Sequence, residues 1–236
     1  MKLKFILPFI LISVLGGPIA AQESVWLREH RAGAAARKRG QLEDAERHYE
    51  KALKEAEKFG EQDKRLPESL HNLALVYKLQ KRYSEAERLF VRAIEIYRRI
   101  SGPDHHIVAF EIENLAELYV AAGKIDEAEP LLTQSLAIAE KARGAEHLLV
   151  ANIVSSLAEV YTKQKKYVQA EPLYQRGLLI YEKSLGADHW TVASLLEEYA
   201  GLLKKMGRKD EAKAMEERVK EIRAKKLPHE PYKIPS

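Results

Sequence analysis

Apolar residues recur along this chain at spacings of three and four, and the groups that they form repeat about every 42 residues. Such spacings place residues on one face of an α-helix. Each repeat contains two such groups, so the pattern predicts two amphipathic helices per unit. The repeat is marked most clearly by an alanine that returns after 41 and then three times after 42 residues: Ala45, Ala86, Ala128, Ala170 and Ala212.

A unit of this length cannot bury its apolar face alone, so neighbouring units must stack. The pattern therefore predicts an all-α solenoid of about five helix pairs. Inside each pair a tight turn is predicted where Gly40, Gly123 and Gly207 recur, with Lys81 and Lys165 at the same place in the other two units. Glycine suits a helix end that requires a positive φ.

A second connection joins successive units and reads Gly-Pro-Asp-His at 102–105, Gly-Ala-Glu-His at 144–147 and Gly-Ala-Asp-His at 186–189. An acidic residue just before a helix accepts hydrogen bonds from free amides and favours the dipole, so these acids are predicted to cap the helices. The histidines are predicted to be structural. A shared metal is disfavoured because packed helices lie about 8–10 Å apart, whereas zinc needs nitrogens at about 2.0–2.1 Å.

The order of residues within one unit resembles the tetratricopeptide repeat (TPR). Residues 73–77 read Leu-Ala-x-x-Tyr and residues 83–87 read Tyr-x-x-Ala-Glu, with a turn between them. The 42-residue period and the Gly-x-Asp/Glu-His linker resemble the longer repeat of kinesin light chains. The resemblance implies a right-handed TPR solenoid over residues 22–226, with units at about 24–65, 66–107, 108–149, 150–191 and 192–226.

The first 21 residues differ from the rest of the chain. Lys2 and Lys4 precede an apolar run over 5–15, and small residues end at Ala21. This is the pattern of a secretory signal peptide, and the predicted cleavage lies between Ala21 and Gln22. The chain is therefore expected to be secreted across the inner membrane, into a bacterial periplasm. An uncleaved leader that anchors the domain at the membrane is the alternative.

Composition narrows the classes of function. The chain has no cysteine, which excludes disulfides, thiolate catalysis, cysteine-based zinc sites and a lipid-modified cysteine. The formal net charge of +4 falls to +2 when Lys2 and Lys4 leave with the leader. Charges of both signs alternate along the predicted helices, so a nucleic-acid partner is not expected. Three prolines in residues 227–236 predict an extended, flexible tail.

In TPR arrays the first helix of each pair lines a concave surface on which peptides or partner helices bind. The resemblance implies ten candidate groove residues here: His71, Asn72, Lys78, Glu113, Asn114, Glu117, Asn152, Ser156, Glu159 and Glu198. Alignment places further lining positions in the last turns of these helices: Leu75, Val120, Thr162, Gly201 and Lys204. All three asparagines of the chain fall on this face, and an amide can donate to and accept from an extended peptide backbone at once.

The predicted groove has uneven charge. Basic residues of the first unit (His30, Arg31, Arg37 and Lys38) precede an acidic face in the later units. This gradient favours a partner segment that carries positive charge near the later repeats.

Motifs for catalysis do not stand out. The sequence contains no glycine-rich phosphate loop and no HExxH, and its carboxylates have the spacing of helix surfaces. The prediction is a non-enzymatic interaction module or assembly scaffold, without a cofactor, that binds a protein or peptide partner. A self-associating structural protein and an accessory subunit of an envelope or secretion complex are the alternatives.

Overall fold

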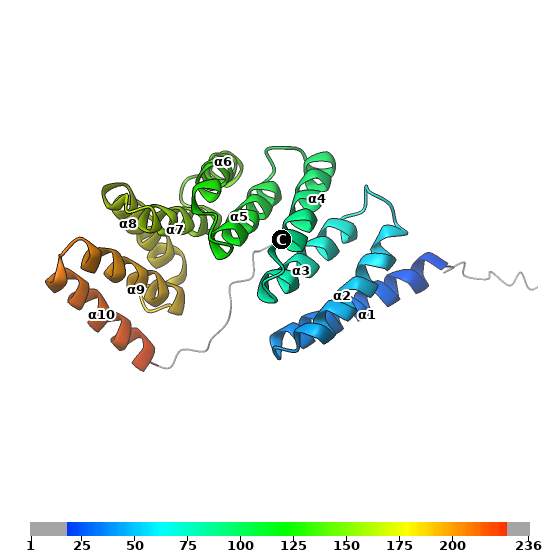
Figure 1. Ribbon diagram of the computed structural model, residues 1–236, viewed down its shortest axis with the longest axis horizontal. Coiled ribbons are helices and arrows are strands. Elements are labelled where there is room, and N and C mark those ends of the chain that lie inside the picture. The colour runs from blue at the N-terminus through cyan, green and yellow to red at the C-terminus, as the bar shows by residue number, and fades with distance from the viewer. Residues whose placement is uncertain (1–17, 226–236) are drawn as a thin grey trace, which may run out of the picture.

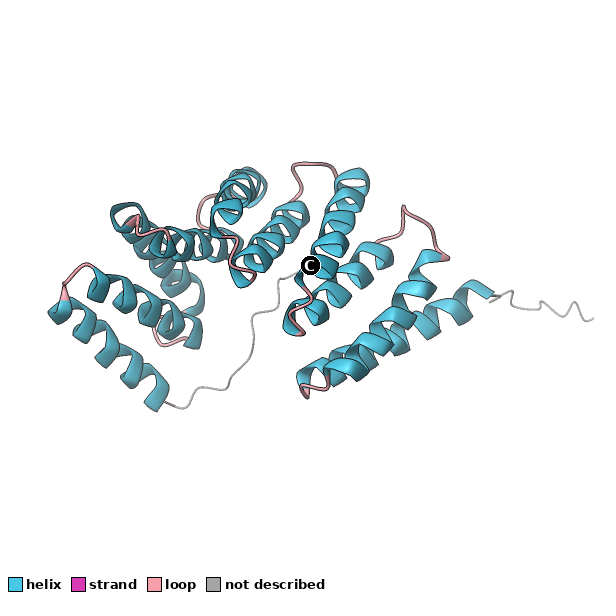
Figure 2. Cartoon of the chain, in the orientation of Figure 1, coloured by secondary structure: helices cyan, strands magenta, loops and turns pink. Residues whose placement is uncertain are grey.

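The computed structural model describes residues 18–225, and within this range the chain forms ten helices and no strand (Figures 1 and 2). The helices are α1 (Pro18–Lys38), α2 (Leu42–Glu57), α3 (Arg65–Leu79), α4 (Tyr83–Ser101), α5 (His106–Ala121), α6 (Ile125–Arg143), α7 (Leu148–Lys163), α8 (Tyr167–Leu185), α9 (Trp190–Lys205) and α10 (Lys209–Ala224). The predicted all-α array of five helix pairs is confirmed.

The helices stack in chain order into an arc (Figure 1). Each helix packs against its neighbours in sequence, and the first helices of successive pairs also touch, α3 against α5, α5 against α7 and α7 against α9. In the view of Figure 1 the outer helices α4, α6 and α8 lie on the convex side of the arc. The first helices, called inner helices below, face the concave side.

Small residues allow the helices of a pair to approach closely. All five marker alanines are fully buried, and Ala74, Ala116 and Ala158 on the inner helices are buried equally well. The first unit has Gly33 at this place, where an added Cβ would lie 2.9 Å from the Tyr49 ring. A large side chain four residues after the marker alanine fills each of the first four pairs: Tyr49, Phe90, Leu132 and Tyr174.

The turn within each pair adopts the left-handed conformation that the glycines predicted. The φ angles are 74° at Gly40, 80° at Gly123 and 81° at Gly207. Lys81 and Lys165 both take a φ of 62° at the equivalent place, where a side chain costs about 1–2 kcal/mol. The stacked array therefore imposes this turn even where the local sequence opposes it.

The helix caps between units differ from the prediction. The histidine accepts the backbone hydrogen bond, with Nδ1 of His105, His147 and His189 at 3.3, 3.1 and 3.2 Å from the amide nitrogen two residues later. The predicted capping role of the acids is therefore wrong, and the predicted structural role of the histidines is confirmed.

The acids of these linkers pair instead with a lysine near the C-terminal end of the outer helix in the helix pair that follows the linker. Asp104 Oδ2 lies 2.5 Å from Lys141 Nζ, and Asp188 Oδ2 lies 2.6 Å from Lys225 Nζ. Glu146 makes the equivalent pair with Lys183. Each linker is thereby joined to the C-terminal end of the outer helix in the pair that follows it.

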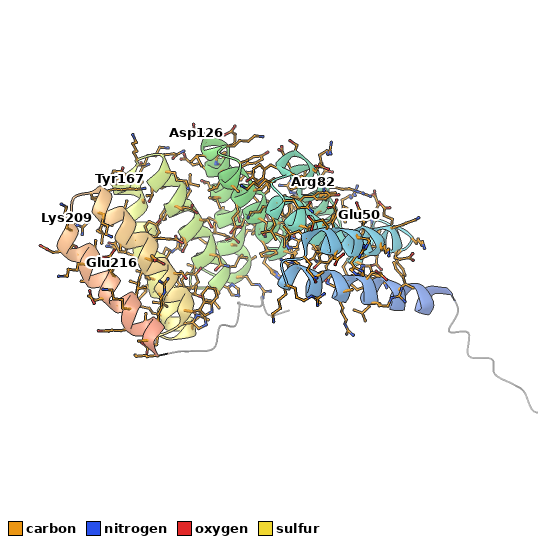
Figure 3. All side chains as sticks on the ribbon, turned by 60° about the horizontal axis from the view of Figure 1, so that its bottom comes forward. Glu50, Arg82, Asp126, Tyr167, Lys209 and Glu216 are labelled. Carbon is orange, nitrogen blue, oxygen red and sulfur yellow. The ribbon has the colours of Figure 1, made fainter. Side chains whose placement is uncertain are left out.

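A second series of ion pairs joins one unit to the next. The glutamate after each marker alanine pairs with a basic residue just before the following outer helix: Glu46 with Arg82 at 2.6 Å, Glu87 with Lys124 at 3.5 Å, Glu129 with Lys166 at 2.8 Å and Glu171 with Arg208 at 2.6 Å. These starts of outer helices follow one edge of the array, as the labels Arg82, Asp126, Tyr167 and Lys209 show in Figure 3. In the fifth unit Lys213 replaces the glutamate.

Two predictions concern segments at the ends of the chain. Most of the predicted leader, residues 1–17, and the predicted tail, 227–236, lie outside the described residues. The helix α1 begins at Pro18 and so runs through the predicted cleavage position. Among residues 18–225, no helix combines the length and apolar character that crossing a membrane requires.

Candidate functional site

A cavity of about 1110 Å³ opens on the concave side of the array. All five inner helices contribute to it, together with one tyrosine each from α4 and α8. Its lining consists of His30, Glu68, His71, Asn72, Tyr97, His106, Ile107, Phe110, Glu111, Glu113, Asn114, Glu117, Asn152, Ser155, Ser156, Glu159, Tyr181, Trp190, Thr191 and Glu198. This cavity is called the groove below.

Nine of the ten candidate residues line the groove, and Lys78 is the exception. Its Nζ lies 2.7 Å from Glu117 Oε2, so Lys78 contributes through an ion pair at the groove margin. The structure thus brings the candidates together across α3, α5, α7 and α9. That they bind a partner stays a prediction.

The groove covers less of the inner helices than the alignment implied. None of the last-turn positions Leu75, Val120, Thr162, Gly201 and Lys204 lines it. Thr162, for example, is buried and donates its hydroxyl to the Ala158 carbonyl at 2.8 Å. The predicted lining by these residues is therefore wrong.

The predicted basic end of the groove is also absent. Of the first-unit residues His30, Arg31, Arg37 and Lys38, only His30 lines it. Burial lowers the pKa of His30, which favours its neutral form despite the nearby Glu68. Burial and then the Arg143 charge lower the pKa of His106 to about 4. These two histidines are therefore neutral at neutral pH.

The three asparagines are held by intramolecular hydrogen bonds. Asn72 Nδ2 donates to the Glu68 carbonyl at 2.9 Å, and Asn114 Nδ2 donates to the Phe110 carbonyl at 2.8 Å. Asn152 Oδ1 accepts from the Tyr181 hydroxyl at 2.6 Å. Each amide has two donors and one acceptor oxygen, so every asparagine keeps hydrogen-bonding capacity toward the groove. Their positions are fixed before a ligand arrives.

Acidic side chains dominate the charge of the groove. Six glutamates line it, while the described lining contains neither lysine nor arginine. Some of these charges are paired: Glu111 Oε2 lies 3.0 Å from His71 Nδ1, and Glu159 Oε1 lies 3.3 Å from Lys163 Nζ. Glu113 is 4% exposed, and burial raises its pKa well above the usual range. The groove is therefore suited to cationic or hydrogen-bond-donating ligands.

Glu198, on α9, is the glutamate of the groove lining that comes last in the sequence. Its side chain keeps access to solvent within the concavity. Partial desolvation, followed by the negative charges of Glu159 and Glu197, raises its pKa to about 7.

Eleven of the twenty lining residues were not among the ten sequence candidates, and Tyr97 and Tyr181 are two of these. They come from the outer helices α4 and α8 and reach the groove between inner helices. They occupy equivalent repeat positions, and Ala139 has that position in the unit between them. This alternation of large and small side chains at one repeat position was the sequence signal that could have identified the two tyrosines. Among residues 18–225 no group of three or more histidine, aspartate or glutamate side chains is arranged to hold a metal ion.

Sequence comparison identifies the class of protein. Four overlapping segments match the family model described as tetratricopeptide repeat: residues 25–99, 65–141, 108–158 and 149–225. Because these matches together run from residue 25 to residue 225, the chain belongs to the tetratricopeptide repeat family. Proteins of this family typically serve as scaffolds that bind other proteins. No curated protein sequence matches the chain.

Comparison with solved structures shows which kind of tetratricopeptide repeat protein the chain resembles. A putative kinesin light chain from Podosopora anserina with nearly identical TPR-like repeats, in a form with one substituted residue, has a TM-score of 0.70 and 26% identity, over 86% of this chain and 96% of that one. BtubC (BKLC) from P. vanneervenii has a TM-score of 0.71 and 22% identity, over 95% and 96% of the two chains. The predicted resemblance to kinesin-light-chain-like TPR proteins is confirmed.

A bacterial protein with a more distant sequence shares the same architecture. The structure of Pseudomonas aeruginosa pilF has a TM-score of 0.62 and 16% identity, over 85% of this chain and 78% of that one. At this identity, as for BtubC, the likeness is one of fold.

Proposed function

We propose that this chain is an exported, non-enzymatic scaffold that holds an extended segment of a partner protein in its groove. The observation that carries the proposal is the continuous cavity of about 1110 Å³ to which all five inner helices contribute. Five helices at a spacing of about 8–10 Å span about 40 Å. About twelve extended residues cover that distance at about 3.3 Å each.

The amides of Asn72 and Asn114 supply the sequence-tolerant part of this binding. They occupy equivalent positions on α3 and α5, so they repeat along the groove as the backbone of a bound strand does. Hydrogen bonds to a peptide backbone give affinity with little dependence on side chains. Selection among sequences then falls to the charged and aromatic residues around them.

The first experiment measures peptide affinity. A displayed library of random peptides of about twelve residues is selected on the full-length protein, and the best binder is titrated against N72A/N114A. Each hydrogen bond contributes about 0.5–1.5 kcal/mol, so losing two should weaken binding about tenfold. Helicity and melting temperature should change little, because both amides donate to carbonyls of their own helices and alanine favours helix.

The matched control is Q134A/Q169A, which removes two exposed amides from the outer helices α6 and α8, away from the groove. Its affinity should equal that of the unaltered protein. Equal affinity in N72A/N114A would overturn the groove model. If no peptide is selected and the sedimentation coefficient rises with concentration, the self-associating structural protein is favoured instead.

Export rests on the sequence of residues 1–21. Cleavage after Ala21 would remove no described core residue, because the first of these is Trp26. N-terminal sequencing of the protein from a periplasmic fraction tests this proposal. Gln22 as the first residue is the expected result, and recovery of the chain with its leader in the membrane fraction would instead favour the anchored alternative.

A further inference from the structure

Glu113 is a buried acidic side chain whose position is not accounted for by the packing of the helices. It lies at the floor of the groove on α5 and is 4% exposed. Within residues 18–225 no hydrogen bond or ion pair reaches its carboxyl group. The charged side chains that act on it are Glu117, which repels its negative charge, and Lys78, which attracts it more weakly. A buried carboxyl group without a partner is costly to a fold. Its lining position instead makes it available to a ligand.

Polar groups of α7 and α8 lie beside this floor. The Tyr181 hydroxyl donates to Asn152 Oδ1 at 2.6 Å. Burial raises the pKa of Tyr181, and the negative charge of Glu113 raises it further. The phenol therefore stays protonated and keeps an oxygen lone pair available to a donor. Glu198 and Glu117 also lie within electrostatic reach of Tyr181, which places this hydroxyl among three carboxyl groups.

The acidic charge of this region is only partly compensated. Lys78 pairs with Glu117, and Lys163 pairs with Glu159. No lysine or arginine in the described range forms an ion pair with Glu113 or Glu198. Apolar surface for the stem of a long side chain is available at Phe110 in the same lining.

We propose that Glu113, Tyr181 and Glu198 form an acidic docking floor for lysine or arginine side chains of the segment bound in the groove. An ammonium or guanidinium group supplies several donors and a positive charge. Glu113 and Glu198 receive no ion pair from a lysine or arginine within residues 18–225. This inference rests on the proposed function and adds the chemistry of the partner: a basic segment.

The test uses the same random peptide library on three full-length proteins: unaltered, E113Q/E198Q and E95Q/E127Q. The last variant is the matched control, because it removes two charges from exposed positions on the outer helices α4 and α6. Peptides selected by the unaltered protein and the control should be enriched in lysine and arginine over the starting library. Peptides selected by E113Q/E198Q should lose that enrichment.

The second readout replaces the lysines of the best binder with acetyl-lysine, which keeps the stem and removes the charge. Acetylation should weaken binding at least about tenfold for the unaltered protein and the control, and less than about twofold for E113Q/E198Q. Circular dichroism verifies that all three proteins are folded.

The outcomes separate the two proposals. Peptides selected without basic enrichment, or an acetylation penalty equal in all three proteins, would overturn the acidic docking floor and leave the groove in place. Selection of no peptide by the unaltered protein would overturn both.

Discussion

At the scale of residues, Glu113 shows how one position opposes the stability of the fold. Its neighbours Ile112 and Leu115 on α5 are apolar and pack in the core, whereas the buried Glu111 is paired with His71. Its carboxyl group at the groove floor gains no hydrogen bond or ion pair from residues 18–225. Conflicts of this kind between local packing and polarity are typical of functional positions.

Replacing Glu113 with glutamine should stabilise the protein, and more so as the pH rises. Burial raises the pKa of Glu113 in the folded state above its usual value of 4.5. The folded state therefore retains a proton that the unfolded chain releases, so the unaltered protein loses stability as the pH rises above about 4.5. At pH 8 we expect E113Q to have a free energy of unfolding about 1–3 kcal/mol higher.

Urea unfolding at about pH 4 and pH 8 measures this difference. At the lower pH both side chains are neutral and similar in shape, so the two proteins should be nearly equal. E127Q, which changes an exposed glutamate of α6, is the control and should match the unaltered protein at both pH values. A gain that is the same at both pH values would contradict the account of Glu113.

At the scale of elements, the repeat predicts the helices well because one physical pattern specifies them five times. The marker alanines and the glycine turns could be predicted from their recurrence in successive units. Lys81 shows the limit of local rules, since the stacked array holds it at a φ of 62° that its own preference opposes. Register with the other units predicted that turn correctly.

The caps and the groove floor were harder to predict from sequence. Where an acidic residue precedes a histidine, either side chain could cap the helix. In the linker at 144–147 His147 is the cap, while Glu146 forms an ion pair with Lys183. Tyr97 and Tyr181 reach the groove from the outer helices. An alignment of the repeats does not show in which direction a side chain points, so it could not predict their position. Alignment therefore recovered nine of the ten candidate positions on the inner helices and missed these two tyrosines.

At the scale of the whole molecule, the array is a preformed surface. Ion pairs between successive units run along one edge, and the inner helices touch their neighbours on the concave side (Figure 1). A surface that is already ordered loses less conformational entropy when it binds an extended segment.

The central claim is that the partner lies on the concave side, and site-specific photo-cross-linking in the cells that produce this chain tests it most directly. A benzophenone side chain is placed at Ser156 on the inner helix α7, which lines the groove, or at Gln134, which is exposed on the outer helix α6. The account predicts that irradiation joins a partner protein to position 156 and not to position 134. Cross-links at position 134 with none at position 156 would contradict it.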